Sequence, residues 1–286
     1  MNESGKINIK LPFFILEKLE NDAITFNITK NKIFNEIYRS FKNKYKGYKI
    51  EINGKYDKKK SFTLNKANHR DYIDIIMGKI YVNNDINEAE YFRDLFYQYS
   101  ILPIFEREKI LFKNNFEKLE KAINEKRKIK LYSKNRVREF NPYFIKQSEE
   151  FNYIFGYCEL RNDYRIFRVS NIKEIDIYNE KIIEYNKEQI EKYKENFDPF
   201  LSSEKRVKVK FTEYGIEKYN KIVSNRPKII KKENNIYLFE CSEKKAQVYF
   251  PQFFTDVEIL EPKSLRKWYK EKLEKALKTY TKDYTS

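Results

Sequence analysis

The stretch FNYIFGYCELRNDYRIFRVSNI, residues 151–172, decides the central part of the fold. Its two halves alternate apolar and aromatic residues with polar ones, which is the pattern of two β-strands joined by a polar turn. Because side chains on a strand point alternately to opposite faces, we expect Arg165 and Phe167 on one face and Ile166 and Arg168 on the other. Unless a bulge or strong curvature reunites them, the two arginines serve different surfaces.

Similar short runs surround this stretch. KIKLYS (128–133), REFNPYFIK (138–146) and KEIDIY (173–178) each read as a strand, and polar residues separate them. A helical stripe of apolar residues over 106–124 precedes them. Several strands at this spacing predict a small antiparallel barrel.

Residues 122–177 resemble a WYL domain, a small SH3-like (Sm-like) β-barrel found mostly in bacterial regulators. The resemblance implies a WYL domain over 116–185 that senses or grips an anionic ligand. The residues that carry the resemblance occur in order and at suitable distances: Tyr132, Arg138, Pro142, Tyr153, Ile154, Gly156, Tyr157, Cys158, Arg165, Phe167, Arg168, Val169 and Ile172.

Two positions depart from that family's pattern. Asn152 stands where the signature tryptophan is usual, and Asn171 stands where an arginine usually precedes Ile172. We expect the first change to affect packing and the second to alter the ligand.

The first 46 residues predict a strand and two helices. In KINIKL (6–11) apolar and polar residues alternate, Pro12 suits the first turn of a helix, and Thr29 is a good N-cap for the next one. The segment resembles the ribbon-helix-helix family, in which two chains pair their strands. The resemblance implies that Lys6, Asn8 and Lys10 face nucleic acid and that the helix start at Thr29 offers N–H groups to a phosphate. A strand-and-two-helix linker without a nucleic-acid role is the alternative.

Residues 47–115 predict a helical linker region. Asn53-Gly54 indicates a possible hairpin turn, and NDINEAEYFRDLFYQYSIL (84–102) reads as a helix that ends before Pro103.

Residues 200–286 predict an α+β domain. The pattern gives strands at VKVKF, PKIIKK, IYLFEC, AQVYF and VEIL, a helix at YGIEKYNKIV and a closing helix at SLRKWYKEKLEKALKTY. The last segments are similar to the C-terminal extension of WYL proteins, which often contributes to oligomerisation. The broad apolar face of the closing helix is expected to pack on its own domain or on a second subunit. The whole chain is thus predicted to be an α+β multidomain protein and a homodimer.

The charge distribution points to a polyanionic partner. The net charge is +16, and residues 121–138 contain eight basic residues against Glu125 alone. Such a cluster of positive charge usually binds nucleic acid or an anionic membrane surface, and a basic face that contacts only solvent is the alternative. Arginine forks match phosphate oxygens, and tyrosines can stack on bases. The candidate ligand-binding residues of the central domain are Tyr132, Arg136, Arg138, Tyr153, Arg165 and Arg168.

No residue pattern indicates an enzyme. The single histidine, His69, has no second histidine to form a catalytic or metal-binding pair, and the six glycines form no phosphate-binding loop. Cys158 and Cys241 lie in apolar runs and are expected to be reduced core residues. We therefore expect no cofactor and no metal. No apolar run is long enough to span a membrane, and the first residues lack a signal peptide's apolar stretch, so a cytoplasmic location is expected.

The order of these parts further resembles the WYL accessory proteins of type VI CRISPR systems. The resemblance implies a non-catalytic dimer that binds single-stranded RNA and enhances an RNA-targeting nuclease. Two alternatives stay open. One is a DNA-binding transcriptional regulator controlled by a ligand, and the other is a module that docks a CRISPR nuclease without touching RNA.

Overall fold

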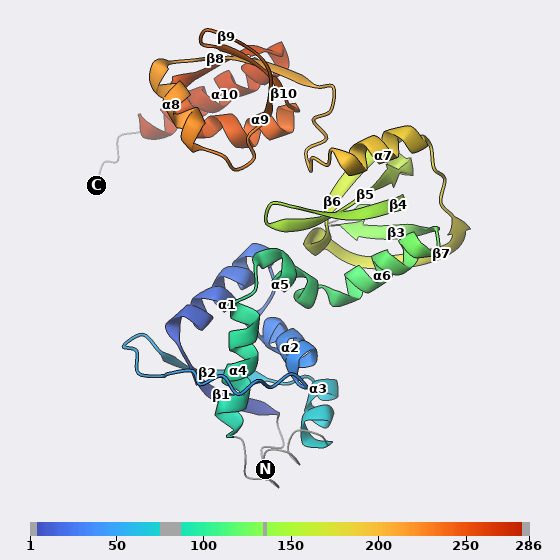
Figure 1. Cartoon of the computed structure of the whole chain (residues 1–286), viewed down its shortest axis with the longest axis vertical. Helices are drawn as coiled ribbons and strands as arrows, with labels where there is room; N and C mark the ends of the chain where they lie inside the picture. The colour runs from blue at the N-terminus through green and yellow to red at the C-terminus, as the bar shows by residue number, and fades with distance from the viewer. Residues whose placement is uncertain (1–4, 75–86, 134–135, 282–286) are drawn as a thin grey trace. The chain divides into compact units, whose positions relative to one another are not determined.

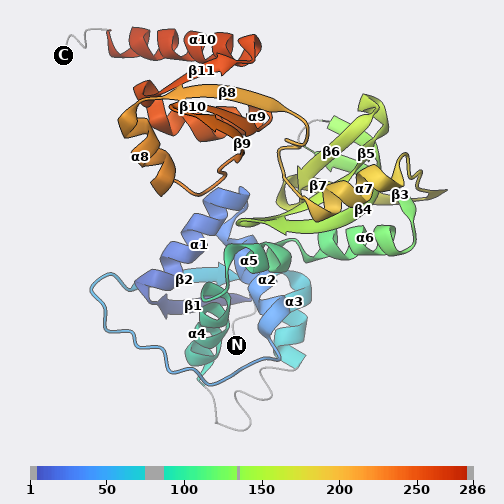
Figure 2. The same ribbon diagram turned by 45° about the horizontal axis from the view of Figure 1, so that its top comes forward.

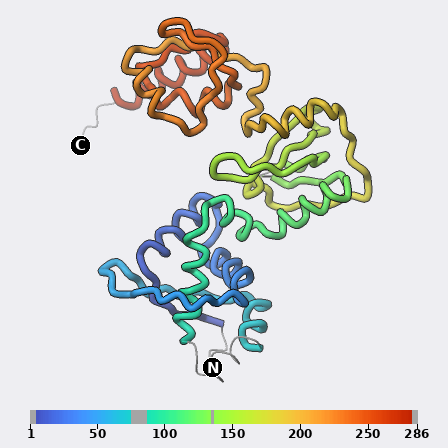
Figure 3. The backbone as a smooth tube through the Cα atoms, in the orientation of Figure 1, coloured from blue at the N-terminus to red at the C-terminus, as the bar shows by residue number. Residues whose placement is uncertain are grey.

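The structure is a computed structural model that describes residues 5–74, 87–133 and 136–281 (Figure 1). The chain divides into two compact units, residues 1–185 and 186–286. Figure 3 follows the backbone through both of them. Each unit has its own hydrophobic core. The predicted class, a mixed α+β protein with several antiparallel sheets, is confirmed.

A two-stranded antiparallel ribbon begins the first unit. It joins β1 (Lys6–Leu11) to β2 (Lys58–Thr63). The predicted alternation on β1 is present, since Ile7, Ile9 and Leu11 are buried while their polar neighbours are exposed. In the ribbon-helix-helix arrangement this strand would pair with a second chain. Here β1 pairs with a strand of its own chain, so that detail of the prediction is not confirmed.

Helices of the first unit pack against the ribbon. Phe34 of α2 stacks on Phe62 of β2 and on Phe96 of α4, which joins three elements. The predicted helix before Pro103 is confirmed as α4, although residues 84–86 lie outside the described residues. The hairpin predicted around Asn53-Gly54 is not formed. Residues 47–54 adopt neither helix nor strand. The helices are α1 (Phe13–Phe26), α2 (Lys30–Phe41), α3 (Lys66–Asp71), α4 (Glu88–Ser100), α5 (Ile104–Leu111) and α6 (Lys113–Asn124).

A buried ion pair fastens α1 to α5. Arg107 donates two hydrogen bonds to the carboxylate of Asp22, from Nε at 2.7 Å and from Nη2 at 2.9 Å, and the Tyr99 hydroxyl donates a third at 2.6 Å. All three side chains are buried. Since a buried charge is tolerated only when it is paired and hydrogen-bonded, this arrangement fixes how the helices cross.

The five strands at the end of the first unit form one antiparallel sheet in the order β6-β5-β4-β3-β7. Among the described strands β6 and β7 are not paired, so hydrogen bonds do not close the sheet into the predicted barrel. Helix α6 packs on β7, β4 and β3. The strands are β3 (Arg127–Ser133), β4 (Arg136–Ser148), β5 (Phe151–Cys158), β6 (Asp163–Arg168) and β7 (Ile172–Lys181), with the short helices η2 (Glu159–Arg161) and η3 (Val169–Asn171) beside β6.

The second unit holds a four-stranded antiparallel sheet in the order β11-β8-β10-β9, with α10 beside β11 (Figure 2). The strand predicted at AQVYF (246–250) is wrong, because these residues lie in α9 and the start of η4. The strands are β8 (Arg206–Phe211), β9 (Lys228–Glu233), β10 (Ile236–Glu240) and β11 (Val257–Glu261), and the helices are α7 (Lys187–Glu195), α8 (Glu213–Lys221), α9 (Glu243–Tyr249), η4 (Phe250–Asp256) and α10 (Lys263–Tyr280).

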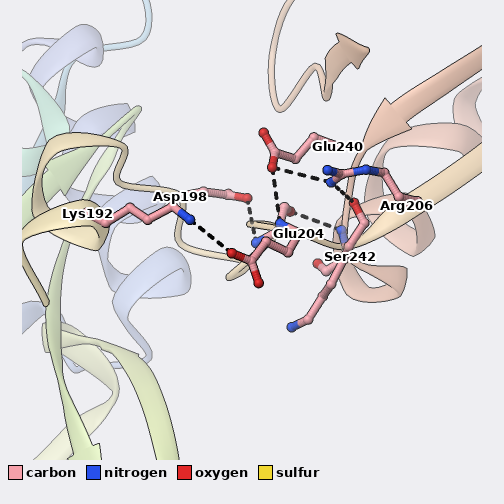
Figure 4. A network of polar contacts seen from close by, with 8 residues as sticks. Lys192, Asp198, Glu204, Arg206, Glu240 and Ser242 are labelled. Carbon is pink, nitrogen blue, oxygen red and sulfur yellow. Dashed lines mark hydrogen bonds and ion pairs between the residues drawn. The ribbon is translucent and has the colours of Figure 1, made fainter. Parts of the chain in front are cut away.

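Polar contacts hold the segment between α7 and β8 against the end of β10 (Figure 4). Glu204 accepts from Lys192 of α7 at 2.9 Å, and its backbone N–H donates to Glu240 of β10 at 3.1 Å. Asp198 accepts from the backbone N–H of Ser202, whose hydroxyl accepts from the N–H of Ser242. These bonds make α7 and the segment that follows it part of the second unit.

Gly156 allows β4 and β5 to approach closely. A Cβ atom at this position would lie 2.2 Å from the carbonyl oxygen of Asn141 and 2.6 Å from Cζ of Phe140. We expect Gly156→Ala to lower the free energy of unfolding by about 1–3 kcal/mol or more, because backbone cannot yield as a flexible side chain can. Chemical denaturation measures the change. Lys146→Ala, at an exposed position on the adjacent strand, is the control and should change stability by less than about 0.5 kcal/mol.

Candidate nucleic-acid interface

Three predicted arginines share one face of the five-stranded sheet. Arg136 lies opposite Ser133, Arg138 opposite Leu131, and Arg165 opposite Gly156. Since directly opposed residues of antiparallel strands project to the same side, the register places all three on the side that also carries Phe140 and Phe167. We call Arg136, Arg138 and Arg165 the arginine face.

The arginine face has few internal partners. Arg138 packs with Cζ 5.3 Å from the ring centroid of Phe167, and its buried Nη1 has no hydrogen-bond partner in the described part of the chain. Arg165 pairs with Asp163 at 3.0 Å, and the two side chains are 37% and 52% exposed. Such exposed ion pairs contribute little, so water or a ligand can compete for this guanidinium.

Arg168 lies on the opposite face, as the alternation predicted, because it pairs with Tyr153 while Phe167 pairs with Ile154. Its Cζ lies 3.2 Å from the ring centroid of Phe151, and its Nε lies 3.5 Å from Oε1 of Glu108. Burial lowers the pKa of Arg168, and the nearby Glu108 carboxylate acts against that shift. Phe151 and Glu108 therefore enclose this arginine, although its buried Nε and Nη2 have no hydrogen-bond partner among the described residues.

The carboxylate of Glu108, on α5, is fully buried. It accepts hydrogen bonds from the backbone N–H of Asn152 at 2.7 Å, from Nδ2 of Asn152 at 2.9 Å and from the backbone N–H of Ser170 at 3.1 Å. Asn152 also donates to the carbonyl oxygen of Phe105 at 2.8 Å. The residue that replaces the signature tryptophan thus joins the sheet to α5.

The predicted tyrosines lie away from the arginine face. Tyr132 projects to the other side of the sheet, with Lys130, and its hydroxyl donates to Asp176 at 3.0 Å. The pKa of Lys130 is raised, chiefly by its hydrogen bond with Tyr132. Tyr153 lies on the same face as Arg168, and burial raises the pKa of its hydroxyl.

Carboxylates already neutralise much of the basic segment 121–138. Arg127 pairs with Glu125 at 2.9 Å. Lys128 lies 2.9 Å from Glu180 and 3.0 Å from Glu159, and these hydrogen bonds raise its pKa. Lys134 lies outside the described residues. Within the described part of this segment, Lys130, Arg136 and Arg138 form no ion pair. The two arginines lie on the arginine face, and Lys130 lies on the other side of the sheet.

The predicted residues of the ribbon form a second basic surface. Lys6, Asn8 and Lys10 are exposed on β1, and the register adds Lys59 and Ser61 of β2 to the same face. We call this surface the lysine ribbon. Sequence reasoning missed Lys59, because the polar run KKKSFT gives no strand signal.

Thr29 serves its own helix. Its Oγ1 accepts a hydrogen bond from the backbone N–H of Lys32 at 3.2 Å, as an N-cap residue does. The prediction concerned the backbone N–H groups of this helix start, and the cap already uses the N–H of Lys32.

Comparisons with known proteins identify one domain of the chain and a solved structure with a similar fold. Residues 114–177 match the family model of the WYL domain, so the chain contains a WYL domain as predicted. A solved structure titled "Crystal structure of a CRISPR Cas-related protein" shares the fold, with a TM-score of 0.72 and 16% identity over 98% of this chain and 95% of that one. No curated protein sequence matches significantly.

A second solved structure is proteasome accessory factor B/C (PafBC) of Arthrobacter aurescens. It has a TM-score of 0.32 and 14% identity, and the match covers 92% of this chain and 46% of that one. A score this low carries no structural argument.

The described part of the chain lacks two further features. Residues 5–74, 87–133 and 136–281 hold no group of three or more His, Cys, Asp or Glu side chains that could bind a metal ion. In the same ranges, no helix is both long and apolar enough to cross a membrane.

Removing the Glu108 carboxylate should destabilise the first unit strongly. Glu108→Ala leaves half-buried Arg168 without its counter-charge and the backbone N–H groups of Asn152 and Ser170 without their acceptor. Breaking a buried pair on one side costs about 3–5 kcal/mol. Urea denaturation of the full chain measures the loss. Glu106→Ala, a partly exposed position on the same helix, is the control; equal small effects of both variants would show that the Glu108 network is unimportant.

Proposed function

We propose that this protein is a non-catalytic nucleic-acid-binding regulator whose arginine face binds single-stranded RNA. The observation that carries the proposal is the alignment of Arg136, Arg138 and Arg165 on one side of the sheet with few internal partners. Each guanidinium can grip two phosphate oxygens or stack on a base. Phe167, which contacts Arg138, adds a half-buried aromatic surface beside them.

A single strand suits this surface better than a duplex. Single-stranded nucleic acid is usually held by a basic groove with aromatic or guanidinium planes against which successive bases stack. The arginine face offers these groups on a sheet, without a helix or ribbon that would enter a major groove. We infer a binding mode that depends on charge and stacking and has little sequence preference.

The overall fold supports an accessory role. The likeness to a CRISPR Cas-related protein extends over 98% of the chain. On this basis we propose that the RNA-bound protein modulates an RNA-targeting CRISPR nuclease in the cytoplasm. The lysine ribbon favours a second candidate, a ligand-responsive DNA-binding transcriptional regulator, because an exposed two-stranded ribbon with lysines and small polar side chains can contact duplex DNA.

We also propose that the protein is a homodimer formed through α10. Leu265 is buried in the second unit, and the Tyr269 hydroxyl donates to the carbonyl oxygen of Ala246. On the same helix face, Leu273 is 45% exposed, Leu277 is 64% exposed and Tyr280 is 88% exposed. Exposed apolar residues in a continuous row often mark a protein interface. A second copy of the same helix offers a complementary apolar row.

Loss of the arginine face should weaken RNA binding. The triple variant Arg136→Gln, Arg138→Gln and Arg165→Gln should bind a single-stranded RNA at least tenfold more weakly. The slope of log K against the logarithm of the salt concentration should also become shallower by roughly two, since each phosphate contact on a single strand contributes about 0.7 to that slope. Fluorescence anisotropy at several salt concentrations measures both quantities.

A charge-matched control separates the face from the net charge. The variant Lys121→Gln, Lys126→Gln and Lys130→Gln removes the same charge from lysines that already contact Glu125, Glu184 and Tyr132. It should have a much smaller effect. Equal losses in the two triple variants would contradict a localised arginine site. Tighter binding of duplex DNA than of RNA, lost on changing Lys6, Lys10 and Lys59, would favour the second candidate.

Polar residues on α10 should disrupt the dimer. We expect the full chain to be dimeric and Leu273→Ser with Leu277→Ser to be monomeric in size-exclusion chromatography with light scattering, because the apolar row is lost. Lys275→Ser with Lys278→Ser, on the opposite side of the helix, should leave the dimer intact. A wild-type monomer at micromolar concentration would overturn the proposal.

A further inference from the structure

A cavity in the first unit lies apart from the arginine face and the lysine ribbon. Its volume is about 490 Å³. Three segments surround it: the α1–α2 corner with the exposed side of α2, the kink at Phe112 between α5 and α6, and the end of η3 with the start of β7. Its location between the N-terminal helices and the WYL domain makes it a site where a ligand would contact both.

The cavity lining is strongly cationic. Lys32 and Arg39 of α2, Lys113 of α6 and Lys173 of β7 contribute four positive charges, whereas Glu36 is the only carboxylate among the lining residues that the structure describes. A concave surface with one sign of charge concentrates ions of the opposite sign. The lining therefore favours an anion.

Internal pairing leaves most of this charge available. Glu36 pairs with Arg39 at 2.6 Å. Burial raises the pKa of Glu36, while Arg39, Lys32 and Lys113 act to lower it, which shows that these cations gather around a single carboxylate. Lys113 also lies 3.6 Å from Glu117, but that pair is exposed and weak.

Other groups in the lining are suited to a ligand with both polar and apolar parts. The Ser170 hydroxyl is buried and has no hydrogen-bond partner among the described residues. Asn27, Asn114 and Asn171 present exposed amides, and buried Phe26 and Phe112 form apolar wall. A buried hydroxyl without a partner is uncommon in proteins, and a bound polar group would satisfy it.

We propose that this cavity binds a phosphorylated ligand of mononucleotide size. The excess of three positive charges fits a phosphate dianion. The volume lies within the range of small-molecule sites, about 300–1,000 Å³, and exceeds what a bare phosphate fills. The apolar wall and the exposed amides suit a sugar and a base. The ligand is either a free mononucleotide or the phosphorylated end of an RNA strand, since both present the same chemistry.

Calorimetric titration of the full chain tests the proposal. The probes are AMP, GMP, CMP and UMP, each beside its nucleoside, and a ten-nucleotide RNA with a 5′-phosphate beside the same RNA with a 5′-hydroxyl. At least one phosphorylated probe should bind tenfold or more tightly than its unphosphorylated counterpart. Preference confined to the RNA pair identifies a strand end, and preference among the monomers identifies a free nucleotide.

Variants assign the binding to this cavity. Lys32→Gln with Lys173→Gln should weaken binding of the phosphorylated probe at least tenfold, and Glu36→Gln should strengthen it because the only carboxylate in the lining is neutralised. Lys18→Gln with Lys66→Gln, two exposed lysines outside the lining, should leave the affinity unchanged.

Several results would overturn the proposal: equal binding of phosphorylated and unphosphorylated probes, no binding of any probe, or the same affinity in the cavity variants and the control. The arginine-face variant should keep its mononucleotide affinity or 5′-phosphate preference. Failure of the RNA-binding proposal and failure of this one are therefore distinguishable.

Discussion

The buried carboxylate of Glu108 joins the helical part of the first unit to the WYL sheet. An ionised carboxylate without water needs donors on its oxygens, and here Asn152 and the backbone of Ser170 supply them while Arg168 supplies a counter-charge. The donors come from β5 and from η3, and the acceptor comes from α5. The position of the sheet relative to this helix is consequently set by charge as well as by the apolar core that both share.

This constraint explains how the arginines are divided. Arg168 lies against Glu108 and the ring of Phe151, whereas Arg165, three residues earlier, projects from the other side of β6. The same network fixes the backbone at Ser170, and Ser170 and Asn171 reach the wall of the cationic cavity. One buried acid thus helps to separate Arg168 from the arginine face and to shape the cationic cavity.

Local patterns predicted much of the secondary structure and little of its pairing. Alternation correctly gave β1 and the opposite directions of Arg165 and Arg168. It failed at AQVYF, where Ala246, Tyr249 and Phe250 are buried at helical spacing and Ser242 caps the helix, so a short apolar run was misread. β2 was missed because its side chains are almost all polar. Register and curvature, which decide whether a sheet closes, depend on contacts that no local pattern contains.

For the candidate sites too, the sequence predicted the residue types but not their partners. Arginine on strands was predictable, and the basic segment indicated where anions gather. The partners that neutralise Lys128 and hold Arg168 lie far away in sequence, so their effect on available charge could not be foreseen. From the sequence, we expected Asn152 in place of the signature tryptophan only to affect packing. In the structure its amide forms a hydrogen bond to Glu108, 44 residues earlier in the chain.

The pairing of β1 with β2 inside one chain also bears on how the protein responds to dilution. A ribbon made from two chains exists only while they are associated, so its stability falls as the concentration falls. A ribbon closed within one chain forms by an intramolecular step whose entropy is that of closing a loop. The lysine surface on it would therefore stay assembled in a cell that contains only a few copies of the protein.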